Sequence, residues 1–254
     1  MSDDPRTRET ALDEEIDELA GEAPIEGARP GLQAARDALD TRESAIRDSV
    51  LRMGMLVESA IRQAGRSLEL HDSALAMEVI GGDTTINDAQ RAVSRLIVEA
   101  IATQQPVARD LRYLLTLDHV TYELERIGDH AASVAKQVLK LAPEPPLEGY
   151  VHLPEMTERA AVLIHGVLRA LVDSDAAQAR EVAVEDDEID RLYHSTFDKG
   201  VEIMRRDPAN VERGTRIIIA SHYLERIGEF AMDVRIDLAV VIGTIDLVAL
   251  ARSA

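Results

Sequence analysis

The sequence predicts an all-α protein of two tandem, similar three-helix bundles, six long helices in all, after a disordered acidic N-terminal tail. From Leu32 onward apolar residues recur at helical spacing, and no segment alternates with period two between turn signals. The pentapeptide LERIG occurs at residues 124–128 and again at 224–228. The longest break in the helical pattern, residues 142–154, falls between the two copies, so an internal repeat organises the fold.

The N-terminal segment differs in composition from the rest of the chain. It is acidic and is interrupted repeatedly by proline and glycine. Such a segment cannot bury enough apolar surface to offset the entropy of ordering it, so we expect it to be mostly disordered. The predicted domains are the tail (1–31), a first three-helix bundle (32–141), a linker (142–153) and a second three-helix bundle (154–254).

Short breaks rich in proline and helix-capping residues divide the two bundles into helices. We expect these helices over residues 32–70, 74–104, 108–141, 154–172, 175–205 and 209–250. Asp72, Ser73 and Ser174 are suitable N-caps, because their side-chain oxygens can accept hydrogen bonds from the free N–H groups of a first turn. Pro106 and Pro208 lie where one helix must end and the next begin.

The composition favours a helical core and restricts the possible partners. Apolar residues make up 46% of the chain but aromatic residues only 3%, so the core must be aliphatic, with Met53, Met55 and Met77 as expected gap-fillers. A net charge of −19 disfavours nucleic acid and anionic lipid and favours cations, metal ions and basic protein surfaces. The absence of cysteine excludes disulfides, thiolate catalysis and cysteine-ligated zinc.

Two apolar signals for export or membrane insertion are missing from the sequence. The N-terminus has no basic and apolar leader, and the most apolar stretch, residues 238–251, is too short to span a bilayer and contains Asp246. We therefore expect a cytoplasmic protein without direct membrane insertion.

Acidic residues surround both copies of the repeat at a spacing that places them on one helix face. Glu125 and Asp129 are four residues apart, as are Glu225 and Glu229, and like charges at this spacing are mildly destabilising. The preceding helix of each repeat carries a second pair of oxygen donors at the same spacing. The eight candidate metal ligands are Asp83, Asn87, Glu125, Asp129, Asp186, Asp190, Glu225 and Glu229.

Counting along the chain places these pairs at the same height. In the first repeat the pairs centre on residues 85 and 127, and the midpoint is Pro106. In the second repeat they centre on residues 188 and 227, and the midpoint lies between Asp207 and Pro208. Because residues equidistant from the turn of an antiparallel helix hairpin lie level with each other, each hairpin can bring two pairs together.

Clustered carboxylate and amide oxygens suit Mg, Ca, Mn and oxidised iron. Gly128 and Gly228 either admit a neighbouring helix or leave room for ions, and Arg126 and Arg226 can pair with the acids three residues later. The alternative is that these acids are ordinary solvated surface charge. His222 is a further candidate ligand, whereas Glu185, Asp187 and Glu188 are expected to face solvent.

At these residues the chain resembles the PhoU family, the accessory and regulatory proteins of bacterial phosphate-specific transport. Residues 104–136 are similar to the family's signature segment, 222–234 to its second copy, and 42–72 to its opening helix. The resemblance covers about residues 32–250 and implies two similar three-helix bundles side by side. Two positions depart from the family's pattern: Asn87 replaces an acid, and Glu229 replaces the more usual Asp.

The resemblance also implies the cofactor and the partners. It implies multinuclear iron or zinc clusters on the surface, held by the eight residues above, with Mg or Mn as further possibilities. It implies a homodimer that contacts the ATPase subunit of the phosphate ABC transporter and the phosphate-sensing histidine kinase. The expected protein is then a non-enzymatic regulator that restrains phosphate uptake and phosphate-starvation signalling.

Two rival functions follow from the same residues. A carboxylate-bridged di-metal enzyme on a helical bundle would use the same donors, but none of the seven histidines has a Glu three residues earlier, as the ferritin-like motif requires. A plain scaffold with no metal would keep the acids only as surface charge.

Overall fold

The computed structural model describes residues 30–147, 152–173 and 183–242. The predicted disordered tail up to residue 29, Ser174, and the last part of the final predicted helix lie outside the described residues. The described residues fall into two units, one that ends at Thr41 and one that begins at Arg42. The description of packing below concerns the second unit.

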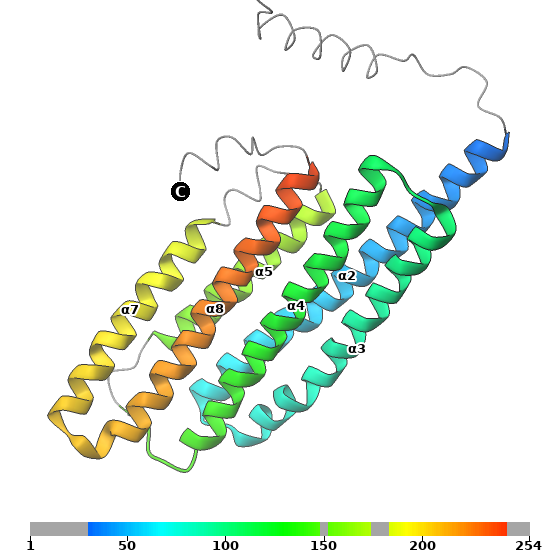
Figure 1. The fold of residues 1–254 in the computed structure, drawn as a ribbon. Helices are drawn as coiled ribbons and strands as arrows, with labels where there is room; N and C mark the ends of the chain where they lie inside the picture. The colour runs from blue at the N-terminus through cyan, green and yellow to red at the C-terminus, as the bar shows by residue number, and fades with distance from the viewer. Residues whose placement is uncertain (1–29, 148–151, 174–182, 243–254) are drawn as a thin grey trace, which may run out of the picture. The chain divides into compact units, whose positions relative to one another are not determined.

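All of the described elements are helical, which confirms the predicted fold class. They are α2 (Pro30–Leu70), α3 (Ser73–Gln104), α4 (Ala108–Leu141), α5 (Leu153–Asp173), α7 (Ala183–Arg206), a short 3₁₀ turn, η1 (Pro208–Asn210), and α8 (Val211–Ile242) (Figure 1). Most of these bounds lie within about two residues of the predicted ones, and residues 174–182, where a helix start was predicted, lie outside the described part.

The predicted capping and turn residues form the two hairpins. Asp72 caps α3 by accepting hydrogen bonds from the backbone N–H groups of Ala74 (2.9 Å) and Leu75 (3.1 Å). At the other end of α3, Gln105 adopts a left-handed conformation with φ of 49°, and Pro106 follows. Asp207 caps η1 before α8. These tight turns make α3 and α4, and likewise α7 and α8, antiparallel neighbours.

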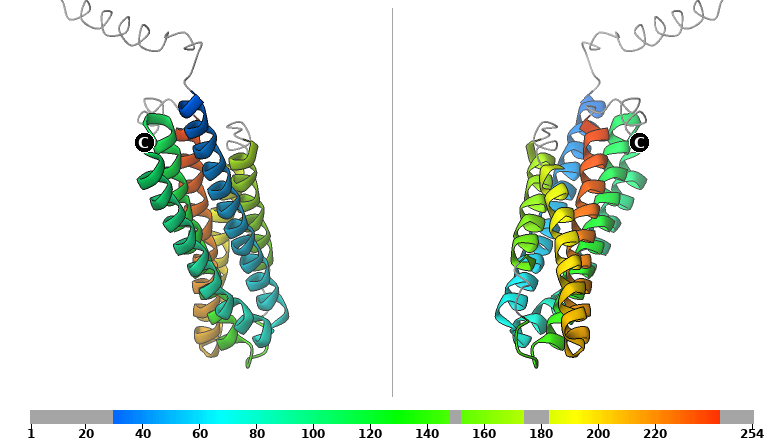
Figure 2. Two further views of the ribbon diagram at one scale, coloured as in Figure 1. Left: turned by 90° about the vertical axis from the view of Figure 1, so that its right-hand side faces the viewer. Right: turned by 90° about the vertical axis from the view of Figure 1, so that its left-hand side faces the viewer.

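The third helices of the two repeats form the centre of the unit. Helices α3, α4, α8 and α7 make one layer in that order, and α2 and α5 lie behind it (Figures 1 and 2). Because α4 and α8 pack against each other, the two LERIG copies are neighbours in space. One hydrophobic cluster runs through all six helices, so the two bundles share a single core.

Close contact between α2 and α5 involves two glycines. A Cβ added to Gly65 would lie 2.2 Å from Cγ2 and 2.7 Å from Cβ of Thr157, so only glycine permits this separation of the two helices at that position. A Cβ added to Gly54 would lie 2.4 Å from Cδ2 of Leu168, the end of a flexible side chain that can rotate. These contacts join the first helix of one repeat to the first helix of the other.

The core is aliphatic as predicted, with one difference. Met53 is fully buried, but Met55 and Met77 are 66% and 60% exposed, so the prediction that both fill the core was wrong. Met55 follows two buried positions on α2 and falls on the outer face, because side chains of a helix turn by about 100° per residue. Among the described residues no helix is long and apolar enough to cross a membrane.

Candidate metal centre

The first hairpin brings four predicted ligands together. Asp83 and Asn87 lie on α3, Glu125 and Asp129 on α4, and we call these four residues the first acid cluster. Nδ2 of Asn87 donates a hydrogen bond to Oδ2 of Asp83 at 3.2 Å. The other carboxylate oxygen of Asp83, Oδ1, is buried and has no hydrogen-bond partner. Such an unsatisfied oxygen costs free energy unless another ligand satisfies it.

The carboxylates of the first acid cluster act on one another across the hairpin. Burial raises the pKa of Asp83, and the negative charge of Asp129 raises it further, whereas Lys136 lowers it. Burial also raises the pKa of Glu125, with further increases from Asp129 and Asp83. The acids of α3 and α4 are therefore close enough to repel each other, as their equal distance from the turn predicted.

The second hairpin repeats this arrangement with four carboxylates. Asp186 and Asp190 lie on α7, Glu225 and Glu229 on α8, and they form the second acid cluster. Burial, and after it the charges of Asp190, Asp187, Glu229 and Glu225, together raise the pKa of Asp186 to about 6. This cluster concentrates more negative charge than the first, because an aspartate takes the place of Asn87.

An unsatisfied buried oxygen also occurs in the second acid cluster. Oδ1 of Asp186 is buried without a hydrogen-bond partner. Nδ1 of His222 lies 3.1 Å from Oε2 of Glu225, so His222 belongs to the edge of this cluster. Burial raises the pKa of Glu225, and the charge of Glu229 raises it further.

The glycines of the two LERIG copies have different neighbours. A Cβ added to Gly128 would lie 3.0 Å from Cδ1 of Ile86, so this glycine admits an apolar side chain of α3. A Cβ added to Gly228 would lie 2.7 Å from Oδ1 of Asp186. The absence of a side chain at Gly228 therefore leaves the space that a carboxylate of the second acid cluster occupies.

Aromatic and cationic side chains fill the junction between the two clusters. The guanidinium carbons of Arg126 and Arg226 lie 3.8 and 4.5 Å from the centre of the Phe230 ring. The imidazole of His130 stacks on Phe230 at 5.2 Å and on Tyr223 at 5.4 Å. Burial lowers the pKa of His130, and Arg226 lowers it further. The sequence did not predict this junction, because it requires α4 and α8 to be packed together.

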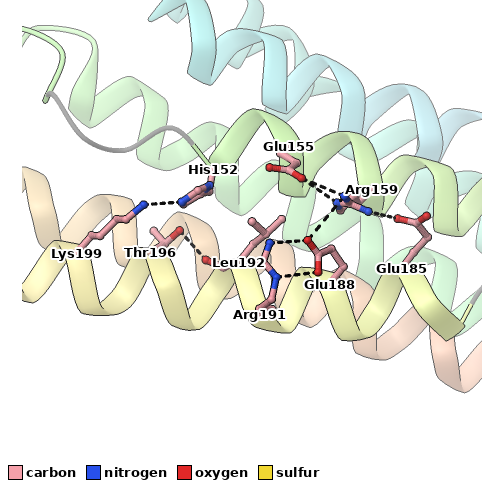
Figure 3. Close-up of polar contacts among 9 residues, drawn as sticks. All are labelled: His152, Glu155, Arg159, Glu185, Glu188, Arg191, Leu192, Thr196 and Lys199. Carbon is pink, nitrogen blue, oxygen red and sulfur yellow. Dashed lines mark hydrogen bonds and ion pairs between the residues drawn. The ribbon is translucent and has the colours of Figure 1, made fainter.

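Two acids that were expected to face solvent instead hold α7 against α5. Figure 3 shows Arg159 of α5 between Glu155 on its own helix and Glu185 and Glu188 on α7. Nη1 of Arg159 lies 2.8 Å from Glu185, and Glu188 is also bound by Arg191. Both acids are half-buried, so the prediction was wrong for them.

Of the three acids expected to face solvent, Asp187 alone is exposed. The arginine partners hold Glu185 and Glu188 in structural ion pairs.

Comparison with known proteins identifies the family. The model of the PhoU domain matches residues 50–138 and 153–235, more than half of the chain and one copy for each repeat. The chain belongs to the PhoU family. The matched segments include both LERIG copies and both acid clusters. The family consists of regulatory proteins that are generally without enzymatic activity.

Relatives and solved structures agree with this membership of the PhoU family. A phosphate-specific transport system accessory protein PhoU homolog from Clostridium acetobutylicum is 34% identical over 185 residues, which cover 72% of this chain and 84% of that protein. Its counterpart from Aquifex aeolicus is 32% identical over 180 residues, covering 71% and 81%.

Two crystal structures share the fold. PhoU from Pseudomonas aeruginosa is similar with a TM-score of 0.78 and 31% identity, covering 81% of this chain and 99% of that chain. The phosphate transport system regulatory protein PhoU from Streptococcus pneumoniae is similar with a TM-score of 0.74 and 26% identity, covering 80% and 96%.

The oxygen donors of both clusters suit, by their chemistry, the metal cluster that the resemblance to the PhoU family implies. Among the described residues, however, they do not surround a single point at which a metal ion would be coordinated. Both clusters offer hard oxygen donors, and each has one buried oxygen without a hydrogen-bond partner, Oδ1 of Asp83 and Oδ1 of Asp186. Within the described ranges, no group of three or more His, Asp or Glu side chains is arranged to hold a metal ion. Binding would therefore require these side chains to change rotamer.

Proposed function

We propose that this chain is a non-enzymatic, cytoplasmic accessory protein of phosphate transport that restrains phosphate uptake and phosphate-starvation signalling. Its membership of the PhoU family carries the proposal, together with relatives described as phosphate-specific transport system accessory proteins. The strongly acidic chain, with a net charge of −19, is poorly suited to bind phosphate directly. It would instead act by contacting other proteins of the system.

The proposed partners are the ATPase subunit of the phosphate ABC transporter and the phosphate-sensing histidine kinase, contacted by a homodimer of this chain. We expect purified chain to form a complex with each partner, and we expect the complex to weaken when its metal is removed by chelation. Size-exclusion chromatography of the mixed proteins, with and without chelator, measures both effects. If no complex forms with either partner under either condition, the proposal is wrong.

The proposed cofactor is a multinuclear metal cluster, of iron or zinc or else of Mn or Mg, held by the two acid clusters. The unsatisfied oxygens of Asp83 and Asp186 support this proposal, because a bound cation would satisfy them and offset the repulsion between neighbouring carboxylates. The metal would supply fixed positive charge that stiffens this surface of the α3–α4 and α7–α8 hairpins.

Metal content is the direct test of the proposed cofactor. We expect untagged protein to carry several equivalents of metal by mass spectrometry. The isosteric variant Glu125→Gln/Asp129→Asn/Glu225→Gln/Glu229→Gln should carry less than about a tenth of that amount, because neutral amides are weaker ligands for hard cations.

A charge-matched control separates ligand loss from loss of net charge. Glu78, Glu144, Asp198 and Glu212 are exposed acids outside both clusters, and their change to Gln or Asn removes the same four charges. This control should keep the metal content of the wild type. Equal, near-zero metal in all three proteins would instead favour the plain scaffold, in which the acids serve only as surface charge.

A further inference from the structure

The arginines of the two LERIG copies bind different partners. Nη1 of Arg126 donates to both carboxylate oxygens of Glu123 at 3.0 Å, and Glu123 is only 5% exposed. Arg226, at the equivalent position of the second repeat, donates to Oε2 of Glu229. The first arginine is thus held by an acid outside its cluster, and the second is held by a member of its cluster.

Two sequence differences explain the change of partner. Position 223, which corresponds to Glu123, is a tyrosine whose ring stacks on His130 and offers no carboxylate. Position 229, which corresponds to Asp129, is a glutamate, whose extra methylene extends its reach. On a helix, residues three positions before and three positions after an arginine are both within its reach. Arg126 therefore binds the preceding acid, Glu123, and Arg226 binds the following acid, Glu229.

We infer that Arg226 is the resident counter-ion of the second acid cluster, and that a metal ion bound there must displace it from Glu229. This inference rests on the proposed binding of metal by the acid clusters. The first acid cluster has no equivalent ion pair among the described residues: Lys136 acts on Asp83 through its charge, without a hydrogen bond or ion pair between them. The two clusters should therefore differ in how readily they take up a cation.

The surroundings of Arg226 allow it to leave Glu229. Its guanidinium already lies over the Phe230 ring at 4.5 Å, beside Arg126 over the same ring at 3.8 Å. The cation–π contact can persist after the ion pair breaks, so displacement does not leave the charge in an apolar site. While the ion pair is intact, it keeps Glu229 engaged, which is consistent with the absence of a preformed metal position among the described residues.

The test measures Mn²⁺ binding to the second acid cluster alone. In a parent protein with Glu125→Gln/Asp129→Asn, free Mn²⁺ is counted by electron paramagnetic resonance during a titration. Adding Arg226→Gln should tighten Mn²⁺ binding at least about fivefold, because it removes a competing, partly screened unit charge. Added salt should reduce this gain.

Two matched controls accompany this change. Arg126→Gln removes the other arginine of the Phe230 ring, and Mn²⁺ affinity should stay within about twofold of the parent. Arg226→Lys keeps the charge near Glu229 and should gain far less than Arg226→Gln. Melting temperature and circular dichroism, recorded for every variant, show whether each one folds.

The outcomes distinguish this inference from the proposal on which it rests. If the parent binds Mn²⁺ and Arg226→Gln binds it with the same affinity, Arg226 is not a counter-ion that metal displaces, and metal binding still stands. If only the Arg226→Gln variant binds, the inference is strongly supported. If neither protein binds Mn²⁺ while both are folded, metal binding at this cluster and the inference are both overturned.

Discussion

Asp186→Asn should stabilise the metal-free protein at pH 7 by about 1–2 kcal/mol. The pKa of Asp186 rises from 3.8 to about 6 in the folded protein, mainly because of burial and then of the charge of Asp190. This difference corresponds to at most about 3 kcal/mol, and solvent screening at a half-buried site reduces the expected gain. Urea unfolding in the presence of a chelator measures it.

The stability difference between Asp186→Asn and the wild type should change with pH, which a general stabilisation by the substitution would not do. Between about pH 4 and 6, the folded protein keeps the proton of Asp186 that the unfolded chain has already released. The wild type should therefore lose stability as pH rises through this window, and the advantage of Asp186→Asn should disappear below about pH 4. A constant advantage from pH 4 to 7 would contradict this origin.

A control and a ligand complete the experiment. Asp198→Asn changes an exposed acid on the same helix and should alter the free energy of unfolding by less than about 0.5 kcal/mol. With Mn²⁺ present, the order of wild type and Asp186→Asn should reverse, because bound metal stabilises the wild type more than a variant in which an amide replaces one carboxylate ligand. This reversal would show that Asp186 contributes to metal binding and not to the stability of the metal-free protein.

The helices and their pairing could be predicted from the sequence because local chemistry determines them. Asp72 marks a helix start because its side chain accepts hydrogen bonds from the first turn, and Pro106 marks a turn because it has no backbone N–H to donate; neither effect needs a tertiary contact. Equal rise per residue along the two arms of a hairpin then places residues equidistant from the turn level with each other. The facing of Asp83 and Asp129 follows from that count and from the buried stripe that includes Ile86 and Ile127.

The remaining features of the site depend on contacts between distant segments. Glu185 and Glu188 have the composition of a solvated face, and only the position of Arg159 on α5 makes them an interhelical ion pair. The predicted pairing of each LERIG arginine with the acid three residues later is confirmed for Arg226, which binds Glu229, and is wrong for Arg126, which binds Glu123. The sequence signal for this difference was that Glu123 precedes Arg126 by three residues, whereas Tyr223 stands at the equivalent position of the second copy. This signal is found only when the two copies are aligned with each other.

Gly65→Ala should destabilise the protein by about 2 kcal/mol. The new methyl group would lie 2.7 Å from Cβ of Thr157 and 2.2 Å from its Cγ2. Rotation of the threonine side chain could move Cγ2, but Cβ is fixed by the backbone of α5, so α2 and α5 must separate. Overpacking of this kind costs roughly 1–3 kcal/mol or more, and the better helix propensity of alanine offsets about 1 kcal/mol of it.

Urea unfolding of two further variants tests this explanation. Gly81→Ala changes a helical glycine of α3 whose added Cβ would meet nothing within 4 Å, so it should gain about 1 kcal/mol through helix propensity alone. In the double variant Gly65→Ala/Thr157→Gly, the Cβ moves from one helix to the other and the close approach becomes possible again. The double variant should therefore be more stable than the sum of the effects of Gly65→Ala and Thr157→Gly measured separately. Additive effects would mean that the α2–α5 contact does not join the two repeats as tightly as the Gly65–Thr157 separation indicates.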